Sequence, residues 1–344
     1  MGLVVFEIPT GALADSFSRK WSAVLGFMIV GISVFLIPFF TDFYYILSLW
    51  FLAGLGMSFV SGADEALVID NLNHHRRKDL YHGFFVKSQS LAGIGAVISP
   101  LAGAAIVKLV AIKNLWFVFG GGFLLMSLVL ALFVAECFHH HKLRLKEIVS
   151  QTFKQSKSGA KFLLSTKPLL FLVLGGMFTS FMFVNEGFQP LLVGLSLPVY
   201  SLGLFYSAMA GIQLVFPFCS GYFKRLRLRT ALSLTTAVSM FLLLALLLVS
   251  SPWYIIGAVL LMLANGFRVI NGPLFSTHAH HLIPNKLRAT VLSARSMLTS
   301  IFASVYTITL GYLMDLFGPQ KIVAFGGLFG ILAIIMYWQI KERS

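Results

Sequence analysis

Uninterrupted apolar runs of about twenty residues dominate this sequence, and short charged loops separate them. A helix needs about 20 apolar residues to cross roughly 30 Å of hydrocarbon. Only 11% of the residues are charged, whereas soluble domains carry about a quarter. Backbone polar groups in lipid must pair within a helix or a closed barrel, and these runs lack the alternation of barrel strands. The chain is therefore predicted to be an all-α integral membrane protein.

Hydropathy predicts ten full spans and one shorter apolar piece, which is Met1–Leu13. The full spans are Trp21–Phe40, Tyr44–Ile69, Gly83–Val107, Leu115–Ala135, Pro168–Phe188, Tyr200–Tyr222, Thr230–Ser250, Trp253–Phe275, Ala289–Tyr312 and Ile322–Ile340. A basic segment at 137–167 divides them. It predicts an N-terminal half at 1–136 and a six-span C-terminal half at 168–344. The segment itself is expected in the cytoplasm, either as a solvated connector or as an amphipathic helix on the inner leaflet.

The positions of the basic residues predict the orientation of the spans. The formal net charge is +14, but most Lys and Arg residues fall in alternate short loops, which argues against a nucleic-acid partner. The positive-inside rule places these loops and the C-terminus in the cytoplasm, at the plasma (inner) membrane, and Met1 outside. The uncharged loop at 188–198 is expected at the outer interface.

Cys137 and Cys219 lie near span ends that are expected on the cytoplasmic side, where a disulfide is disfavoured. Two well-separated thiols are also no metal motif. We expect no cofactor and no metal ion. The expected partners are the lipid bilayer and a small-molecule substrate, and the chain is expected to act as a monomer.

A spaced set of residues follows the short apolar piece. Gly11, Asp15, Arg19 and Lys20 fit the pattern Gly-x-x-x-Asp-(Arg/Lys)-x-Gly-(Arg/Lys)-(Arg/Lys), from which Ser16 and Ser18 depart. The pattern resembles the loop between the second and third helices of the major facilitator superfamily. Two further stretches fit in order. Residues 61–67 with Asp70 resemble the inner half of the fourth helix, and residues 288–290 with Ser293 resemble the start of the eleventh.

The resemblance implies twelve helices in two six-helix halves, and secondary active transport of a small molecule by alternating access. On this alignment the chain lacks the first helix and part of the second, which agrees with Met1 lying outside. An upstream start codon or a disrupted gene would explain this, and a working short transporter is the bolder alternative. A truncated, non-transporting product is therefore the second functional hypothesis.

The same resemblance implies a gate built from the motif. Asp15 would lie near Ala289 and Thr290 at the start of the eleventh helix, where the helix dipole favours a carboxylate by about 0.3–1 kcal/mol. Arg19 would pair with Asp70. These contacts would hold the cytoplasmic side closed and break on opening. The alternative is that the motif only caps helices and fixes topology.

Ionisable residues inside spans cost roughly 2.5–3.5 kcal/mol at mid-helix, so each is a functional candidate. The candidates for the substrate or proton pathway are Glu7, Glu65, Glu186, Asn265, Arg268 and Asn271. Glu65, Glu186 and Arg268 lie on spans that line the cavity in the family, so they are expected to contact the substrate or a proton. A structural role is expected instead for Asp64, Asp70, Lys87 and Arg295.

Two shared helix faces are also expected from spacing. Ser58 and Ser61 would share one face with Glu65, and Thr179 would share another with Glu186.

Gly95, Ser99, Pro100 and Gly103 partly match the Gly-x-x-x-Gly-Pro-x-x-Gly pattern of proton-coupled drug exporters. The pattern favours efflux of an amphipathic drug or metabolite, as in an antiporter. Close packing of small residues is an equally good explanation.

A third hypothesis is a membrane-embedded acyltransferase, because His74 and Asp79 have the His-x4-Asp spacing of such enzymes. The short basic loop that holds them leaves no room for a catalytic domain. The chain is therefore predicted not to be an enzyme.

Overall fold

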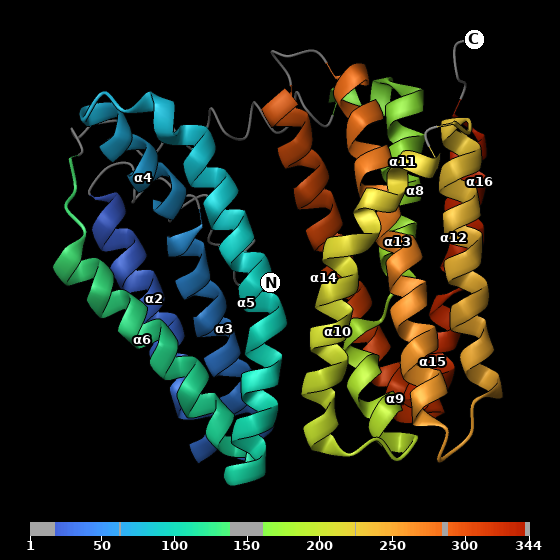
Figure 1. Cartoon of the computed structure of the whole chain (residues 1–344), viewed down its shortest axis with the longest axis horizontal. Helices are drawn as coiled ribbons and strands as arrows, with labels where there is room; N and C mark the ends of the chain where they lie inside the picture. Colours follow the sequence, from blue (N-terminus) through green and yellow to red (C-terminus); the bar gives the residue numbers. More distant parts are fainter. Residues whose placement is uncertain (1–17, 62, 138–160, 224, 284–287, 341–344) are drawn as a thin grey trace. The chain divides into compact units, whose positions relative to one another are not determined.

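The computed structural model describes residues 18–61, 63–137, 161–223, 225–283 and 288–340, with only some of the side chains between 280 and 301. Every secondary-structure element in these residues is a helix (Figure 1). The all-α prediction is therefore confirmed.

Contacts divide the described residues into two compact units. Unit 1 holds residues 18–92 and 105–137, and unit 2 holds residues 93–104 and 161–340. The middle of one long helix thus packs with unit 2. The predicted domain boundaries at 136 and 168 stay predictions, since most of the central segment lies outside the described residues.

The described residues of unit 1 form α-helices joined by short 3-10 turns, and α5 belongs to it at both ends. They are α2 (Arg19–Leu36), η1 (Ile37–Phe39), α3 (Phe43–Val60), α4 (Ala63–His74), η2 (Lys78–Leu80), α5 (Tyr81–Leu109), η3 (Ile112–Asn114) and α6 (Leu115–Phe133). In Figure 1 these are the blue to green helices, and α2 packs against both α3 and α6.

Unit 2 contains the remaining elements. They are α8 (Lys167–Phe181), η4 (Asn185–Gly187), α9 (Phe188–Gly194), η5 (Val199–Ser201), α10 (Leu202–Val215), η6 (Phe216–Cys219), α11 (Ser220–Phe223), α12 (Leu228–Leu244), η7 (Ala245–Leu248), α13 (Tyr254–Leu282), α14 (Arg288–Phe317), α15 (Pro319–Gly326) and α16 (Phe329–Trp338). Within it, α8 packs against α13, α14 and α16, and α12 packs against α13 and α16.

The predicted spans match helices of the structure. In the part of the chain that is described, nine helical segments are long and apolar enough to cross a membrane, and each overlaps one predicted span. The tenth, Ala289–Tyr312, lies within α14, which is helical over 30 residues. The helix α13 continues to Leu282, beyond the predicted end at Phe275. The short piece Met1–Leu13 lies outside the described residues.

A helix break makes one shared-face prediction wrong. The structure ends α3 at Val60 and begins α4 at Ala63, inside a run that hydropathy reads as one span. Ser58 is buried and donates a hydrogen bond of 2.6 Å to the Leu55 carbonyl, whereas Glu65 is exposed. A common face needs one continuous helix, and the backbone does not supply it.

A second break separates Thr179 from Glu186. The helix α8 ends at Phe181, and Glu186 lies in the 3-10 turn η4, so the predicted common face is wrong. The prediction of a loop at 188–198 is wrong as well, because its first part is the helix α9, while its place at the outer interface stays a prediction. Leu191 and Leu192 of α9 are fully buried, since they pack into the core of unit 2.

Small residues allow the helices of unit 1 to approach closely. A Cβ atom on Gly26 of α2 would lie 2.6 Å from the Gly56 carbonyl oxygen of α3. Serine hydroxyls add hydrogen bonds between helices: Ser22 donates to the Phe59 carbonyl at 2.9 Å, and Ser127 of α6 donates to the Val24 carbonyl at 2.8 Å. In lipid, where apolar burial gives helices little reason to associate, such contacts hold them together.

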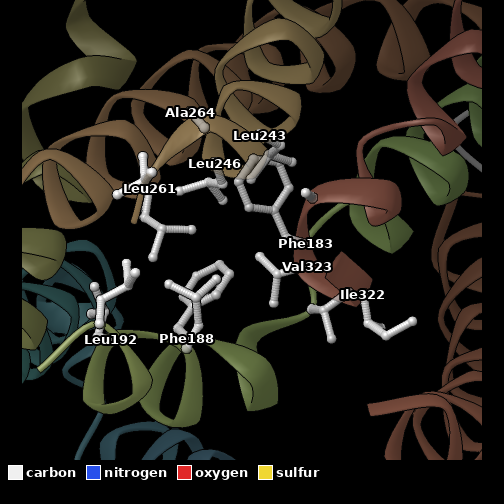
Figure 2. Packing of buried hydrophobic residues seen from close by; sticks show 14 of the residues in the cluster. Phe183, Phe188, Leu192, Leu243, Leu246, Leu261, Ala264, Ile322 and Val323 are labelled. Atoms are coloured by element: carbon white, nitrogen blue, oxygen red, sulfur yellow. The ribbon is translucent and has the colours of Figure 1, made fainter. Parts of the chain in front are cut away.

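Unit 2 has a core of large apolar side chains (Figure 2). Its members come mainly from α9, α10, α12, α13, α14 and α15, from η7, and from the turn between α8 and η4. Figure 2 labels Phe183, Phe188, Leu192, Leu243, Leu246, Leu261, Ala264, Ile322 and Val323. The core packs against the ends of α8 and α9. Backbone groups at such helix ends cannot form hydrogen bonds with lipid, so protein must cover them.

Candidate functional site

The described part of the motif begins at the N-terminus of α2. Ser18 caps this helix by accepting a hydrogen bond of 3.0 Å from the Trp21 amide. Arg19 forms an ion pair with Asp70 of α4, and the two side chains are 19% and 25% exposed. The expected pair is therefore present, while its gating role stays a prediction. Gly11, Asp15 and Glu7 lie outside the described residues, as do the side chains of Ala289 and Thr290.

Sequence reasoning missed Glu136 at this end of unit 1. Its carboxylate accepts hydrogen bonds from the Arg19 amide at 2.7 Å and the Lys20 amide at 3.2 Å, and from the Ser18 hydroxyl. A carboxylate at this position satisfies amides that have no partner within the helix and complements the helix dipole. The Lys20 ammonium instead lies 5.4 Å from the centre of the Trp21 ring.

Asn71 completes this arrangement from α4. Its side-chain amide donates to the Ala135 carbonyl at 2.8 Å and accepts from the Cys137 amide at 3.1 Å. Together, Ser18, Arg19, Asp70, Asn71 and Glu136 form what we call the α2 cluster. It joins one end of α2 to the ends of α4 and α6.

A pocket of about 260 Å³ lies in unit 2, where α8 meets α13, α14 and α16. Arg268 of α13 and Arg295 of α14 both line it. Thr179, Asn271 and Tyr337 supply polar groups, and Phe275 supplies an aromatic face. Of the three pathway residues predicted on α13, Arg268 and Asn271 line this pocket, and Asn265 does not.

Hydrogen bonds and a ring hold the guanidinium of Arg268 in place. Its Nε and Nη2 atoms donate to Asn265 Oδ1 at 3.0 and 2.7 Å, and its Cζ atom lies 4.9 Å from the Phe183 ring centre. Asn265 is itself buried, and its amide contacts Met209 Sδ at 3.0 Å. Asn265 therefore positions Arg268 instead of facing the pocket.

Arg295 lines the same pocket, although the sequence favoured a structural role for it. Its Cζ atom lies 3.9 Å from the Phe275 ring centre. The described side chains place no carboxylate in ion-pair contact with either Arg268 or Arg295.

A buried polar network supports the far wall of the pocket. Asn271 hydrogen-bonds with Thr235 and donates to Thr236 at 3.2 Å, both on α12. The hydroxyls of Thr179 and Tyr337 lie 2.9 Å apart. Sequence reasoning missed Tyr337 because it sits inside an otherwise apolar span.

The two described candidate carboxylates, Glu65 and Glu186, lie outside the lining of this pocket. Glu186 is exposed in η4, and Glu65 is exposed in the first turn of α4, which belongs to unit 1. The Glu65 amide bonds to Asp64 Oδ1 at 2.8 Å. Lys87 is also exposed.

The exporter-like pattern lies in the middle of α5. Apart from the adjacent backbone of α5, no described heavy atom lies within 4 Å of a Cβ built on Gly95 or Gly103, and Ser99 is exposed. The Pro100 carbonyl oxygen instead lies against Gly203 of α10, so closely that a Cβ atom on Gly203 would clash with it. This segment therefore packs through Pro100.

The His74–Asp79 spacing does not produce a catalytic pair. Asp79 forms an ion pair with Arg77 at 3.3 Å, and the His74 ring contacts the ring of His75. The three histidines at 139–141 lie outside the described residues.

Comparisons with known proteins agree on one family. A family model described as Major Facilitator Superfamily matches residues 1–307. An uncharacterized MFS-type transporter of Bacillus subtilis (strain 168), YxaM, is 22% identical over 348 residues, covering 97% of this chain and 83% of that protein. Among solved structures, the nucleoside transporter NupG has a TM-score of 0.70 at 12% identity, covering 99% of this chain and 88% of that chain.

Two other transporter structures share the fold. An inward-facing, unoccupied bacterial homolog of the human lysosomal transporter Spinster has a TM-score of 0.70 at 13% identity, covering 98% and 88% of the two chains. A POT family transporter has a TM-score of 0.63 at 17% identity, covering 98% and 84%. The family match, the transporter relatives and the membrane-spanning helices indicate a transmembrane transporter and not an enzyme. The chain belongs to the Major Facilitator Superfamily.

Proposed function

We propose that this protein is a secondary active transporter that carries a small molecule by alternating access, and that the pocket in unit 2 is part of its substrate site. The observation that carries the proposal is the pocket itself: about 260 Å³ between apolar helices, lined by two arginines and several hydroxyl and amide groups. Polar groups inside membrane spans are costly, so their gathering around one cavity favours a role in solute passage.

The arrangement of the pocket supports binding. Asn265 and Phe183 fix the Arg268 guanidinium before any substrate arrives. Such preorganisation lowers the conformational entropy that a side chain loses on binding.

We propose a gating role for the α2 cluster. The Arg19–Asp70 pair and the Glu136 carboxylate tie the ends of three helices together, so this part of unit 1 would move as a rigid body. Alternating access in such folds uses rigid-body motion around a fixed site. The proposed contact of Asp15 with the start of α14 would release on opening.

Coupling to protons is proposed for Glu186. It is an ionisable side chain in a helix break within the apolar segment Lys167–Gly194, and a carboxyl there could bind and release a proton as the protein changes state. Export by antiport is the proposed direction, supported by the sequence pattern around Pro100. The charge of the loops supports a cytoplasmic C-terminus at the plasma membrane. We also propose that the protein acts as a monomer.

A cysteine block tests the pocket. In the full chain, with Cys137 and Cys219 replaced by Ser, Ser276→Cys would place a thiol in the pocket lining. Thr277→Cys is the matched control, because the adjacent Thr277 lines a different cavity. In proteoliposomes loaded with a metabolite panel, a thiol reagent should stop transport by the first variant and spare the second.

Equal inhibition of both variants, or of neither, would contradict the assignment of the pocket. Absence of transport of every compound tried would favour the non-transporting alternative. The same vesicles test Glu186: an imposed pH gradient should drive transport by the unmodified protein but not by Glu186→Gln. An undiminished response would remove Glu186 as a proton carrier.

A further inference from the structure

We infer that the substrate carries an anionic oxygen group, a carboxylate or a phosphate, which the two arginines of the pocket bind. The inference rests on the proposed function, because it takes the pocket in unit 2 to be the substrate site. It adds the chemical class of the substrate.

The charge of the pocket points to this class. Arg268 and Arg295 are cations at any physiological pH, since a guanidinium does not deprotonate in proteins. The pocket lining contains no carboxylate among the described residues, and neither arginine has an ion pair with a described side chain. The polar neighbours, such as Thr179 and Asn271, are neutral. The formal charges on the described walls of the pocket are thus all positive.

The donors of Arg268 are arranged for an oxyanion. Asn265 Oδ1 accepts from Nε and Nη2 only, so the hydrogens of Nη1 have no bond to a described residue. A guanidinium presents parallel N–H groups that match the two oxygens of a carboxylate or phosphate. Asn265 and the Phe183 ring fix the plane of this fork from behind.

Arg295 supplies the second set of donors. Its guanidinium lies over the Phe275 ring at 3.9 Å and makes no hydrogen bond to a described partner. The ring holds the cation through its π face and consumes none of its N–H groups. Its N–H groups therefore have no described hydrogen-bond partner, and the residue lines the pocket.

Energetics favour an anionic occupant over the other classes. Two like charges that line one pocket repel each other, and the part of each that is removed from water is costly unless an opposite charge compensates. A cation would add a third positive charge, whereas an anion offsets both. The volume of about 260 Å³ lies at the small end of ligand sites, which admits a small metabolite.

Binding to the purified full chain in detergent tests the inference without requiring transport. The probes are two matched pairs, benzoate with benzamide and phenyl phosphate with phenol, measured by calorimetry at constant ionic strength. We expect only the charged member of at least one pair to bind. Arg268→Gln and Arg295→Gln should each weaken that binding about ten-fold or more.

Arg225→Gln is the control, because it removes the same charge from an exposed turn of unit 2. Its binding should equal that of the unmodified protein. Arg268→Lys covers the case in which the Gln variant fails to fold: it keeps the charge but loses the planar fork, and should bind with intermediate affinity. The pair that responds tells a carboxylate site from a phosphate site.

Anionic lipid is the other source of a phosphate. Phosphatidylglycerol in the micelle should leave probe binding as it is in phosphatidylcholine; strong competition would assign the pocket to a lipid headgroup and overturn the inference. Equal binding of neutral and charged probes, full binding by the Arg variants, or no binding of either anion at millimolar concentration would overturn it too. Transport of a neutral solute that Ser276→Cys labelling blocks would leave the transporter proposal standing while the anion inference fails. Charge-selective binding without transport of any compound would support the anion inference while the transporter proposal fails.

Discussion

At the scale of single residues, the spacing of residues in the sequence predicted some contacts of the structure and missed others. Arg19 and Asp70 could be paired from the motif. Glu136 could not, because it lies 117 residues from the amide it binds, and no local pattern links a helix start to the end of another helix so far along the chain. Its isolated charge after an apolar run was the only signal. Tyr337 was missed because its largely apolar ring lies in an apolar span and does not stand out from its neighbours.

The ion pair of the α2 cluster can be tested by a double-mutant cycle. Arg19→Gln leaves the half-buried Asp70 carboxylate without its cation, which should destabilise the protein by about 1–2 kcal/mol. Asp70→Asn should cost a similar amount, and the double variant less than the sum of the two. Thermal unfolding in detergent measures the three changes. Additive losses would mean that the pair contributes no coupling.

At the scale of elements, the spans were predictable because about 20 apolar residues have few options in lipid. The breaks were not. Polar residues do follow both helix ends, with Asp64 and Glu65 after α3 and Asn185 and Glu186 after α8. Polar residues also occur inside unbroken helices such as α13, so they do not by themselves predict a break. Phe183 and Phe188 pack into the core of unit 2 on either side of η4, and the helix α9 follows where an outer loop was expected.

Helix contact at the pocket gives a prediction at this scale. A Cβ on Gly175 of α8 would overlap the Tyr337 ring of α16, and that ring lines the pocket. Gly175→Ala should therefore shift Tyr337, cost about 1–3 kcal/mol of stability and impair transport. Gly211→Ala is the matched control, since no described atom lies within 4 Å of its added Cβ. Equal transport by the two variants would show that the Gly175 contact is dispensable.

At the scale of the whole molecule, the family was recognisable from a motif near the start of the chain and from the order of the spans. The pocket was only half predictable. Arg268 stood out as a charge inside a span, but Arg295 lay close to a helix end and gave no sign that it shares a cavity with Arg268. Their meeting depends on the packing of α13 and α14 against α8, which no single span encodes.

The most direct test of the account is whether the pocket opens to both sides of the membrane. Right-side-out and inside-out vesicles containing Ser276→Cys, with Cys137 and Cys219 replaced by Ser, would be treated with a membrane-impermeant thiol reagent. Alternating access predicts labelling in both orientations, and the transported compound at saturation should slow it. Labelling from one side only, unchanged by any transported compound, would contradict the account.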